Sequence, residues 1–314
     1  MAVALLFPGQ GSQYVGMGKD LVEAFPAARE LFARAEAVLG FPLQSICFEG
    51  PEEVLVQTQY TQPAIFVHSC AALKILEQAG LHFDGVAGHS LGEYSALVAA
   101  GVLEFETALR LVATRGKEMQ EAGRRNPGTM AAVLGLSPED VERVCVQARN
   151  EAEWVGPANF NAPGQIVISG SPPAVERAAE LARQAGAKRV IPLPVSGAFH
   201  SPLMAPAAES FAKILQDVEL NPARVPVYCN STGQPERDPR GLREALQKQL
   251  SSPVLWEQSL RRMLADGFDT FYEVGPGNVL LGLLRRVDRE AKGMAAGKAE
   301  ELREILNQLR GAEP

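Results

Sequence analysis

Residues 86–93 read Val-Ala-Gly-His-Ser-Leu-Gly-Glu, and this stretch decides the fold. An apolar run leads into it, and apolar residues at helical spacing follow over 91–102. A strand, a glycine-flanked Ser90 and a helix form the Gly-x-Ser-x-Gly pattern of a nucleophile elbow. Gly88 and Gly92 would let strand and helix approach closely, while the serine sits on a strained turn with its hydroxyl exposed. The alternative interpretation is that Ser90 only caps the helix, which needs neither glycine.

The composition is that of an ordinary globular protein. Of 314 residues, 46% are hydrophobic and 21% charged, which is enough for one large core or two unequal ones. The net charge of −7 gives nucleic-acid binding no electrostatic support. The four cysteines lack metal or redox spacing, and residues 1–7 are too few for a signal peptide or a membrane span. We therefore expect a cytoplasmic protein with no metal, cofactor, nucleic-acid or membrane partner.

The loop after the first predicted strand is a candidate part of the site. Residues 2–7 are continuously apolar, as in a central parallel strand, and the glycine-containing loop 8–13 follows. Met17 stands where a phosphate loop needs lysine, and the dinucleotide-binding glycine pattern is also absent. In an elbow enzyme, a backbone N–H from such a loop completes the oxyanion hole with the residue after the nucleophile. This predicts Gln10 and Leu91 as the two donors.

An arginine falls on the buried side of a predicted helix over 104–120. Ala108, Leu111, Val112 and Met119 form its apolar stripe, and Arg115 lies on the same stripe. Either Arg115 extends its charged head to water or forms a structural ion pair, or it borders a cavity and meets a ligand's anion.

The chain changes character after a polar linker at 123–128. The predicted order strand, helix, strand, strand, helix, strand then follows, which is typical of a ferredoxin-like unit. We therefore predict an α/β fold in which a large hydrolase-like domain with a mostly parallel sheet comprises residues 1–126 and 196–314. The inserted small ferredoxin-like (βαββαβ) subdomain comprises residues 127–195.

One of the four histidines stands at the seam between these units, where clefts form. His200 is therefore the candidate base for the serine, and a satisfied packing histidine is the alternative. His89 adjoins the serine but would point away from it, and His68 and His82 are expected to be structural. No acidic residue stands out as the third member of a triad: Glu273 ends a predicted strand, but its position proves nothing. A backbone carbonyl could hold the imidazole as well.

Several separated segments together resemble the malonyl-CoA:acyl carrier protein transacylases of bacterial type II fatty acid synthesis. The resemblance covers nearly the whole chain in order. The segments are Phe7-Pro8-Gly9-Gln10-Gly11-Ser12-Gln13, Gly88-His89-Ser90-Leu91-Gly92-Glu93, Arg115, Gly197-Ala198-Phe199-His200, Gln249-Leu250 with Pro253-Val254, and Glu273-Val274-Gly275-Pro276-Gly277.

The resemblance implies a role for each matching residue. Ser90 would be the nucleophile and His200 its base, oriented by a main-chain carbonyl. Arg115 would pair with the malonyl carboxylate, and Gln249 would lie near the base. The backbone N–H groups of Gln10 and Leu91 would again form the oxyanion hole. The reaction implied is malonyl transfer from coenzyme A to acyl carrier protein for fatty acid biosynthesis, through a malonyl-serine ester.

The resemblance also bears on selectivity and partners. Related domains of polyketide synthases often carry His-Ala-Phe-His where malonyl is preferred and Tyr-Ala-Ser-His where methylmalonyl is. This chain has Gly197 in place of the first histidine but keeps Ala198-Phe199-His200, which favours malonyl as the acyl group. We expect a monomer that meets acyl carrier protein transiently. The basic pairs Lys188-Arg189, Arg124-Arg125 and Arg285-Arg286 are the candidate contacts for that acidic partner.

Two other classes share part of this pattern. A serine hydrolase such as a thioesterase has the same elbow and base and releases free acid. A non-catalytic acyl-binding or carrier-docking module would keep the fold without serine chemistry.

Overall fold

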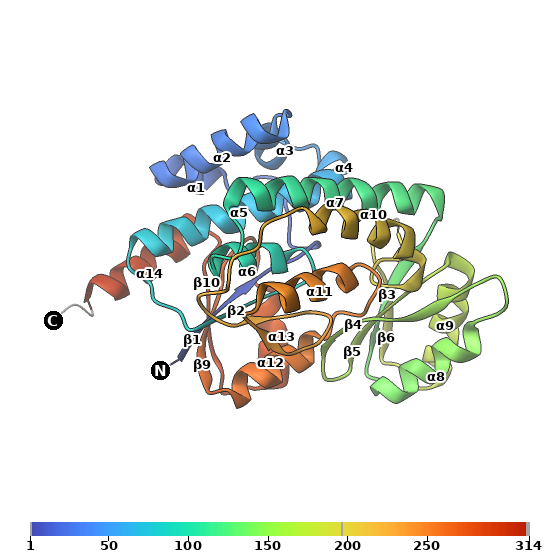
Figure 1. The fold of residues 1–314 in the computed structure, drawn as a ribbon. Coiled ribbons are helices and arrows are strands. Elements are labelled where there is room, and N and C mark those ends of the chain that lie inside the picture. Colours follow the sequence, from blue (N-terminus) through green and yellow to red (C-terminus); the bar gives the residue numbers. More distant parts are fainter. Residues whose placement is uncertain (1, 196, 312–314) are drawn as a thin grey trace.

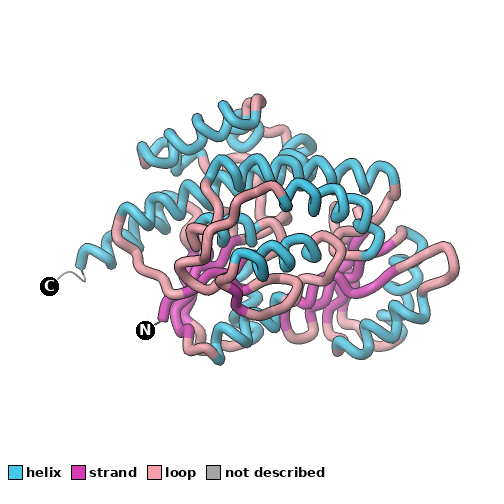
Figure 2. Tube along the Cα trace, viewed as in Figure 1, coloured by secondary structure: helices cyan, strands magenta, loops and turns pink. Residues whose placement is uncertain are grey.

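The computed structural model describes residues 2–195 and 197–311, and its helices surround two separate groups of strands (Figures 1 and 2). The larger group is a six-stranded sheet in the order β10-β9-β1-β2-β7-β8. Neighbouring strands are parallel except for β7 and β8. The strands are β1 (Ala2–Phe7), β2 (Gly85–Gly88), β7 (Val227–Tyr228), β8 (Pro235–Glu236), β9 (Phe268–Glu273) and β10 (Lys292–Ala295).

Strand β1 shows why its sequence is continuously apolar. Successive side chains of a strand point to opposite faces of the sheet. Val3, Leu5 and Phe7 enter one hydrophobic core, whereas Ala4 and Leu6 enter the other. The strand is therefore buried on both faces, as the sequence predicts for a central parallel strand.

Helices cover both faces of this sheet (Figure 1). Those before the small sheet are α1 (Lys19–Ala24), α2 (Pro26–Leu39), α3 (Leu43–Phe48), α4 (Glu52–Leu55), α5 (Thr58–Gln78), α6 (Gly92–Ala99) and α7 (Phe105–Arg125). Those after it are the 3₁₀ turn η1 (Pro202–Met204), α10 (Ala205–Gln216), α11 (Pro239–Gln249), α12 (Trp256–Ala265), α13 (Val279–Val287) and α14 (Ala299–Gly311).

Helix α7 corrects one expectation from the sequence. It runs to Arg125, so it continues past the predicted end at residue 120 and takes up the first part of the predicted linker 123–128. Gly123 is tolerated because it is buried within the helix, and a single glycine costs only about 1 kcal/mol. Asn126 caps the helix in an extended conformation, just before a proline that cannot continue it.

The second sheet has four antiparallel strands in the order β4-β5-β3-β6. Its elements are β3 (Thr129–Leu134), α8 (Pro138–Ala148), β4 (Val155–Ala162), β5 (Gln165–Gly170), α9 (Pro172–Gln184) and β6 (Arg189–Pro192). Chain order and strand order are those of the ferredoxin-like fold expected from the sequence. We propose that this unit spans residues 127–195, while positions 1, 196 and 314 of the expected domain limits lie outside the described residues.

The two faces of the small sheet have different roles. Ala131 and Val133 on β3 pack with α8 and α9 in a core of their own. The alternate residues Met130 and Ala132 face a cavity between the two sheets. The small sheet is also tied to the larger unit, because Phe160 N–H donates to the carbonyl of Val254 at 2.9 Å. One face of the small sheet therefore forms a wall of the cleft.

Two further findings bear on the expectations from composition. All four cysteines are buried and free of disulfides. In the described part of the chain, no helix combines the length and the apolar character that crossing a membrane requires.

Candidate active site

The elbow is a tight turn from β2 into α6, with Ser90 between them. Ser90 has a φ of 50°, a left-handed conformation that is uncommon for a residue with a side chain. A Cβ atom at Gly88 would lie 1.9 Å from backbone atoms of Gly92, and one at Gly92 would lie 2.1 Å from the carbonyl oxygen of Phe7. Both glycines are therefore required by the close approach of strand and helix, and capping alone does not explain them.

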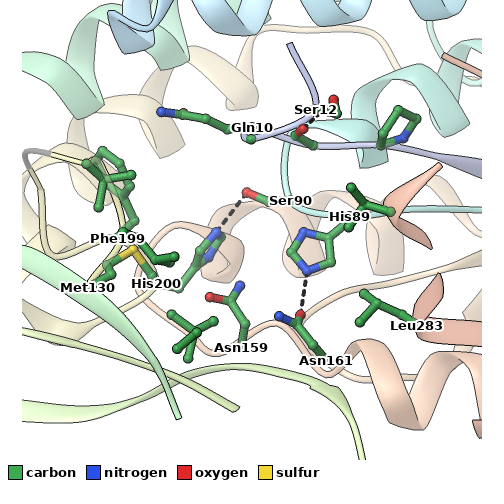
Figure 3. A pocket seen from close by; sticks show the side chains of 18 of the residues that line it. Gln10, Ser12, His89, Ser90, Met130, Asn159, Asn161, Phe199, His200 and Leu283 are labelled. Atoms are coloured by element: carbon green, nitrogen blue, oxygen red, sulfur yellow. Dashed lines mark hydrogen bonds between the residues drawn. The ribbon is translucent and has the colours of Figure 1, made fainter. Parts of the chain in front are cut away.

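The hydroxyl of Ser90 is part of a chain of hydrogen bonds. Its Oγ lies 2.7 Å from Nε2 of His200, and Nδ1 of His200 lies 2.9 Å from the main-chain oxygen of Gln249 (Figure 3). Because a carbonyl oxygen only accepts, Nδ1 carries the proton and Nε2 is free to accept from the serine. His200 also has a positive φ of 56°. The geometry is thus that of a serine and a base held by a backbone carbonyl.

The environment keeps His200 neutral. Its side chain is only 4% exposed. Burial, followed by the nearby charge of Arg115, lowers the pKa of His200 to about 3. A neutral imidazole can accept a proton, so the histidine is in the form that a general base needs.

Arg115 lies on α7 behind the serine and is fully buried. Its Nη2 donates to Ser90 Oγ at 3.0 Å and to Gln249 Oε1 at 2.9 Å, and its Nη1 donates to Gln62 Oε1 at 2.8 Å. Within the described residues, no carboxylate lies within salt-bridge distance of the guanidinium, and its Nε has no hydrogen-bond partner. The snorkelling alternative is excluded, and a buried cation without a direct counter-ion remains beside the serine.

The two expected oxyanion donors have unused backbone N–H groups. Gln10 lies in the loop after β1, and Leu91 is the first residue after the serine. Neither N–H has an acceptor among residues 2–195 and 197–311. The side chain of Gln10 is turned toward Thr58, with its Nε2 3.3 Å from the threonine hydroxyl, and its backbone N–H is left for a ligand.

A cavity of about 260 Å³ opens beside these groups. Figure 3 shows Ser90 facing His200, while the ring of His89 turns the other way. His89 Nε2 lies 2.8 Å from Asn161 Oδ1 on β4, and its ring packs against Trp256. His89 therefore connects the elbow to the small sheet. The lining residues are Pro8, Gly9, Gln10, Gly11, Ser12, His89, Ser90, Met119, Met130, Ala132, Asn159, Asn161, Gln165, Val167, Leu193, Val195, Phe199, His200, Val279, Leu280 and Leu283.

Glu273 serves a different element. Its buried carboxylate accepts from the N–H groups of Leu280 and Leu281, at 3.1 and 2.9 Å, and so caps α13. Burial raises the pKa of Glu273 to about 7. Since the Nδ1 atom of His200 is bonded to a carbonyl, Glu273 has no place in the hydrogen-bond chain of the serine.

Several polar residues that surround the serine are not predicted from the sequence. Gln62 on α5 binds Arg115, and Asn230 Oδ1 accepts the Ser90 N–H at 2.6 Å. Asn230 follows β7, the strand parallel to β2. Polar residues after neighbouring parallel strands lie at the same edge of the sheet, so this signal was present in the sequence. Gln62 carries no such signal, because only helix packing brings it to the site.

Comparison of the sequence and the fold with known proteins shows the family of this chain. A model of the acyl transferase domain matches residues 4–302. The chain belongs to the acyl transferase family. Among its relatives is the malonyl CoA-acyl carrier protein transacylase of Bacillus subtilis (strain 168), 46% identical over 308 residues, which cover 98% of this chain and 97% of that one. The enzyme of the same name from Escherichia coli (strain K12) is 47% identical over 285 residues, or 90% and 92% of the two chains.

Solved structures of acyl transferases agree with the fold. The acyl carrier protein S-malonyltransferase of Vibrio cholerae O1 biovar eltor has a TM-score of 0.93 and 44% identity, covering 97% of this chain and 100% of that one. A malonyl-transacylase in complex with its type II PKS acyl-carrier protein has a TM-score of 0.95 and 41% identity, with 98% and 100% covered. This acyl transferase therefore shares one architecture with them from end to end.

No group of three or more histidine, cysteine, aspartate or glutamate side chains in the described part of this acyl transferase could hold a metal ion. The expectation that the reaction needs no metal or cofactor stays a prediction.

Proposed function

We propose that this chain transfers the malonyl group from coenzyme A to the pantetheine thiol of acyl carrier protein, for fatty acid biosynthesis. The observation that carries the proposal is the buried guanidinium of Arg115, 3.0 Å from the hydroxyl of Ser90 and without a carboxylate partner among the described residues. Burying a cation is costly unless an anion meets it. A malonyl group bound as a thioester offers a carboxylate a short distance from the carbon that the serine attacks.

The first half-reaction follows from the hydrogen-bond chain. Ser90 Oγ attacks the thioester carbon as its proton passes to Nε2 of His200. The N–H groups of Gln10 and Leu91 stabilise the negative charge on the former carbonyl oxygen. The carbon–sulfur bond then breaks, and the coenzyme A thiolate takes the proton from His200. A malonyl-serine ester remains.

The second half-reaction reverses these steps with another thiol. The pantetheine thiol of the carrier gives its proton to His200 and attacks the ester, and the proton returns to Ser90 Oγ as the ester bond breaks. Arginine suits the malonyl end because its planar fork can bind a carboxylate through two parallel hydrogen bonds. Gln249 supports both half-reactions through its carbonyl, which accepts from His200.

The carrier is expected to dock on a basic rim of the cleft. Lys188, Arg189 and Arg286 line one shallow hollow beside the small sheet. Arg286 Nη1 donates to Gln165 at 2.9 Å, and Gln165 also lines the cleft. Of the basic pairs found in the sequence, these residues are therefore our candidates for contact with an acidic carrier. The monomeric state and the cytoplasmic location stay predictions from the sequence.

Product analysis tests this function against the two alternatives. The chain is incubated with malonyl-CoA, with and without holo acyl carrier protein. We expect malonyl-carrier to form, with little free malonate, and we expect Ser90→Ala to abolish its formation. The exposed Ser45→Ala is the matched control. Malonate as the main product would favour a hydrolase, and no turnover by the folded protein would favour a binding module.

A further inference from the structure

A second buried charge lies behind the elbow, and neither half-reaction uses it. Glu93 is the last residue of the elbow stretch, and its side chain is only 1% exposed. Within the described residues, no cation lies within salt-bridge distance of its carboxylate. Burial raises the pKa of Glu93 to about 7, whereas hydrogen bonds from Gln249 and Asn230 and the charge of Arg115 favour its ionised form. A carboxyl group that is costly to bury is expected to have a structural or functional role.

The carboxylate of Glu93 accepts hydrogen bonds from two residues in distant parts of the chain, one main-chain N–H and one side-chain amide. Its Oε1 accepts the backbone N–H of Asn230 at 3.2 Å. Its Oε2 accepts from Nε2 of Gln249 in a short hydrogen bond. Both partners are only 1% exposed, so water cannot replace these contacts easily.

Asn230 and Gln249 in turn hold the backbone of the nucleophile. Asn230 Oδ1 accepts the N–H of Ser90 at 2.6 Å, and its Nδ2 donates to the carbonyl of Gly88 at 2.6 Å. Gln249 Nε2 donates to the carbonyl of Ser90 at 2.9 Å. The left-handed conformation of Ser90 is thus fixed from both sides by the side chains of the two residues that hydrogen-bond to Glu93.

The same contacts set the orientation of the Gln249 amide. Its Nε2 faces Glu93 and the Ser90 carbonyl, so its Oε1 faces Arg115 and accepts from Nη2 at 2.9 Å. An amide therefore stands between the buried anion and the buried cation. Glu93 provides a negative charge that balances Arg115 across the Gln249 amide. The guanidinium therefore has a nearby counter-charge without a direct ion pair.

We propose that Glu93 is a positioning residue, which holds Ser90 in line with His200 through Asn230 and Gln249. This inference rests on the proposed function only for the identity of the acyl group. A carboxylate is required because both of its oxygens face donors. In Glu93→Gln the new NH₂ group must point at one of those donors and lose a hydrogen bond.

The test compares Glu93→Gln with Glu118→Gln, a partly exposed glutamate on α7. Two probes react with Ser90: malonyl-CoA, and a fluorophosphonate that carries neither a carboxylate nor coenzyme A. We expect the rate constants for both to fall about 10-fold or more in Glu93→Gln, while KM for malonyl-CoA changes less than about two-fold. Glu118→Gln should react like the wild type. A merely structural role would lower the melting temperature without this separation of kcat from KM.

The outcomes separate the two proposals. A folded Glu93→Gln protein that reacts with the fluorophosphonate at the wild-type rate overturns the positioning role. A wild-type protein that reacts with the fluorophosphonate but not with malonyl-CoA contradicts the proposed function alone. If Glu93→Gln does not fold, Glu93→Asp takes its place, since it keeps the charge but is too short to reach both partners. We expect Glu93→Asp to slow fluorophosphonate labelling, and an unchanged rate would again overturn the proposal.

Discussion

The Nη2 atom of Arg115 lies 3.0 Å from Oγ of Ser90, so a fully buried cation touches the proposed nucleophile. This contact places the charge where it can meet a substrate carboxylate while the acyl carbon lies at the serine. Diacid selectivity and nucleophilic attack would then depend on neighbouring atoms of one site.

Replacing Arg115 tests the selectivity. We expect Arg115→Ala to lower kcat/KM for malonyl-CoA about 100-fold or more, because two charge-assisted hydrogen bonds to the carboxylate are lost. Transfer from acetyl-CoA should be kept or should rise. Arg115→Met repeats the test with a side chain that keeps the aliphatic part of the arginine but not its charge. Arg110→Ala, at an exposed position on the same helix, is the control. An unchanged preference for malonyl in a competition between the two esters would contradict the role given to Arg115.

Reversing charges on the basic rim tests the carrier surface. The double variant Lys188→Glu with Arg189→Glu should raise KM for acyl carrier protein about 10-fold and weaken its dependence on salt. Acylation of Ser90 by malonyl-CoA alone, measured without carrier, separates this effect from any change in the first half-reaction. Arg303→Glu with Arg310→Glu, on α14 at the opposite end of the molecule in Figure 1, is the control. A carrier KM that both double variants leave unaltered would place the docking surface elsewhere.

The two elbow glycines should tolerate no side chain. We expect Gly92→Ala to lower the free energy of unfolding by about 3 kcal/mol or more, because its Cβ would lie 2.1 Å from the oxygen of Phe7. At Gly282 in α13 an added Cβ meets nothing within 4 Å. Gly282→Ala should therefore raise the free energy of unfolding, by up to about 1 kcal/mol. Urea denaturation measures both, and a Gly92→Ala protein as stable as the wild type would disprove the close-approach argument.

A histidine remote from the site should make stability depend on pH. His68 is fully buried, its Nε2 donates to the carbonyl of Gly297 at 2.7 Å, and burial lowers its pKa from 6.5 to about 4. Between these values the unfolded chain binds a proton that the folded chain does not, so this histidine lowers stability as the pH falls. In His68→Gln the amide can still donate to the carbonyl but does not titrate.

Urea unfolding of both proteins at two pH values measures this effect. From about pH 7.5 to about pH 5, the difference between them should shift by roughly 2 kcal/mol in favour of His68→Gln. The measurement at the higher pH is the control, because both side chains are neutral there. A difference that stays constant with pH would show that His68 is not held neutral by burial.

The sequence was sufficient for the parts of the site that depend on local pattern. The elbow follows from glycine spacing between a strand and a helix, and the position of His200 follows from the place where the small unit returns to the large one. The orientation of Arg115 follows from its place on the apolar stripe of α7. For Arg115 the helical period gives the buried face, whereas Ser90 and His200 lie in turns and are located by the order of the elements around them.

The rest depends on contacts that no local pattern encodes. The partner of His200 is a main-chain oxygen of Gln249, and every residue has such an atom, so spacing alone cannot identify it. Gln62 reaches Arg115 only through the packing of α5. Asn230 can be placed after a strand from the sequence, but it reaches Ser90 only because that strand lies beside β2. The helices α1, α3 and α4 have 6, 6 and 4 residues, too few to show a helical period.

In the proposed reaction, Ser90 carries the malonyl group between the two thiols. Intact-mass measurement after incubation with malonyl-CoA, without carrier protein, tests it most directly. We expect one malonyl adduct on the wild type, its disappearance on addition of holo acyl carrier protein, and no adduct on Ser90→Ala. An adduct that persists on folded Ser90→Ala would contradict it.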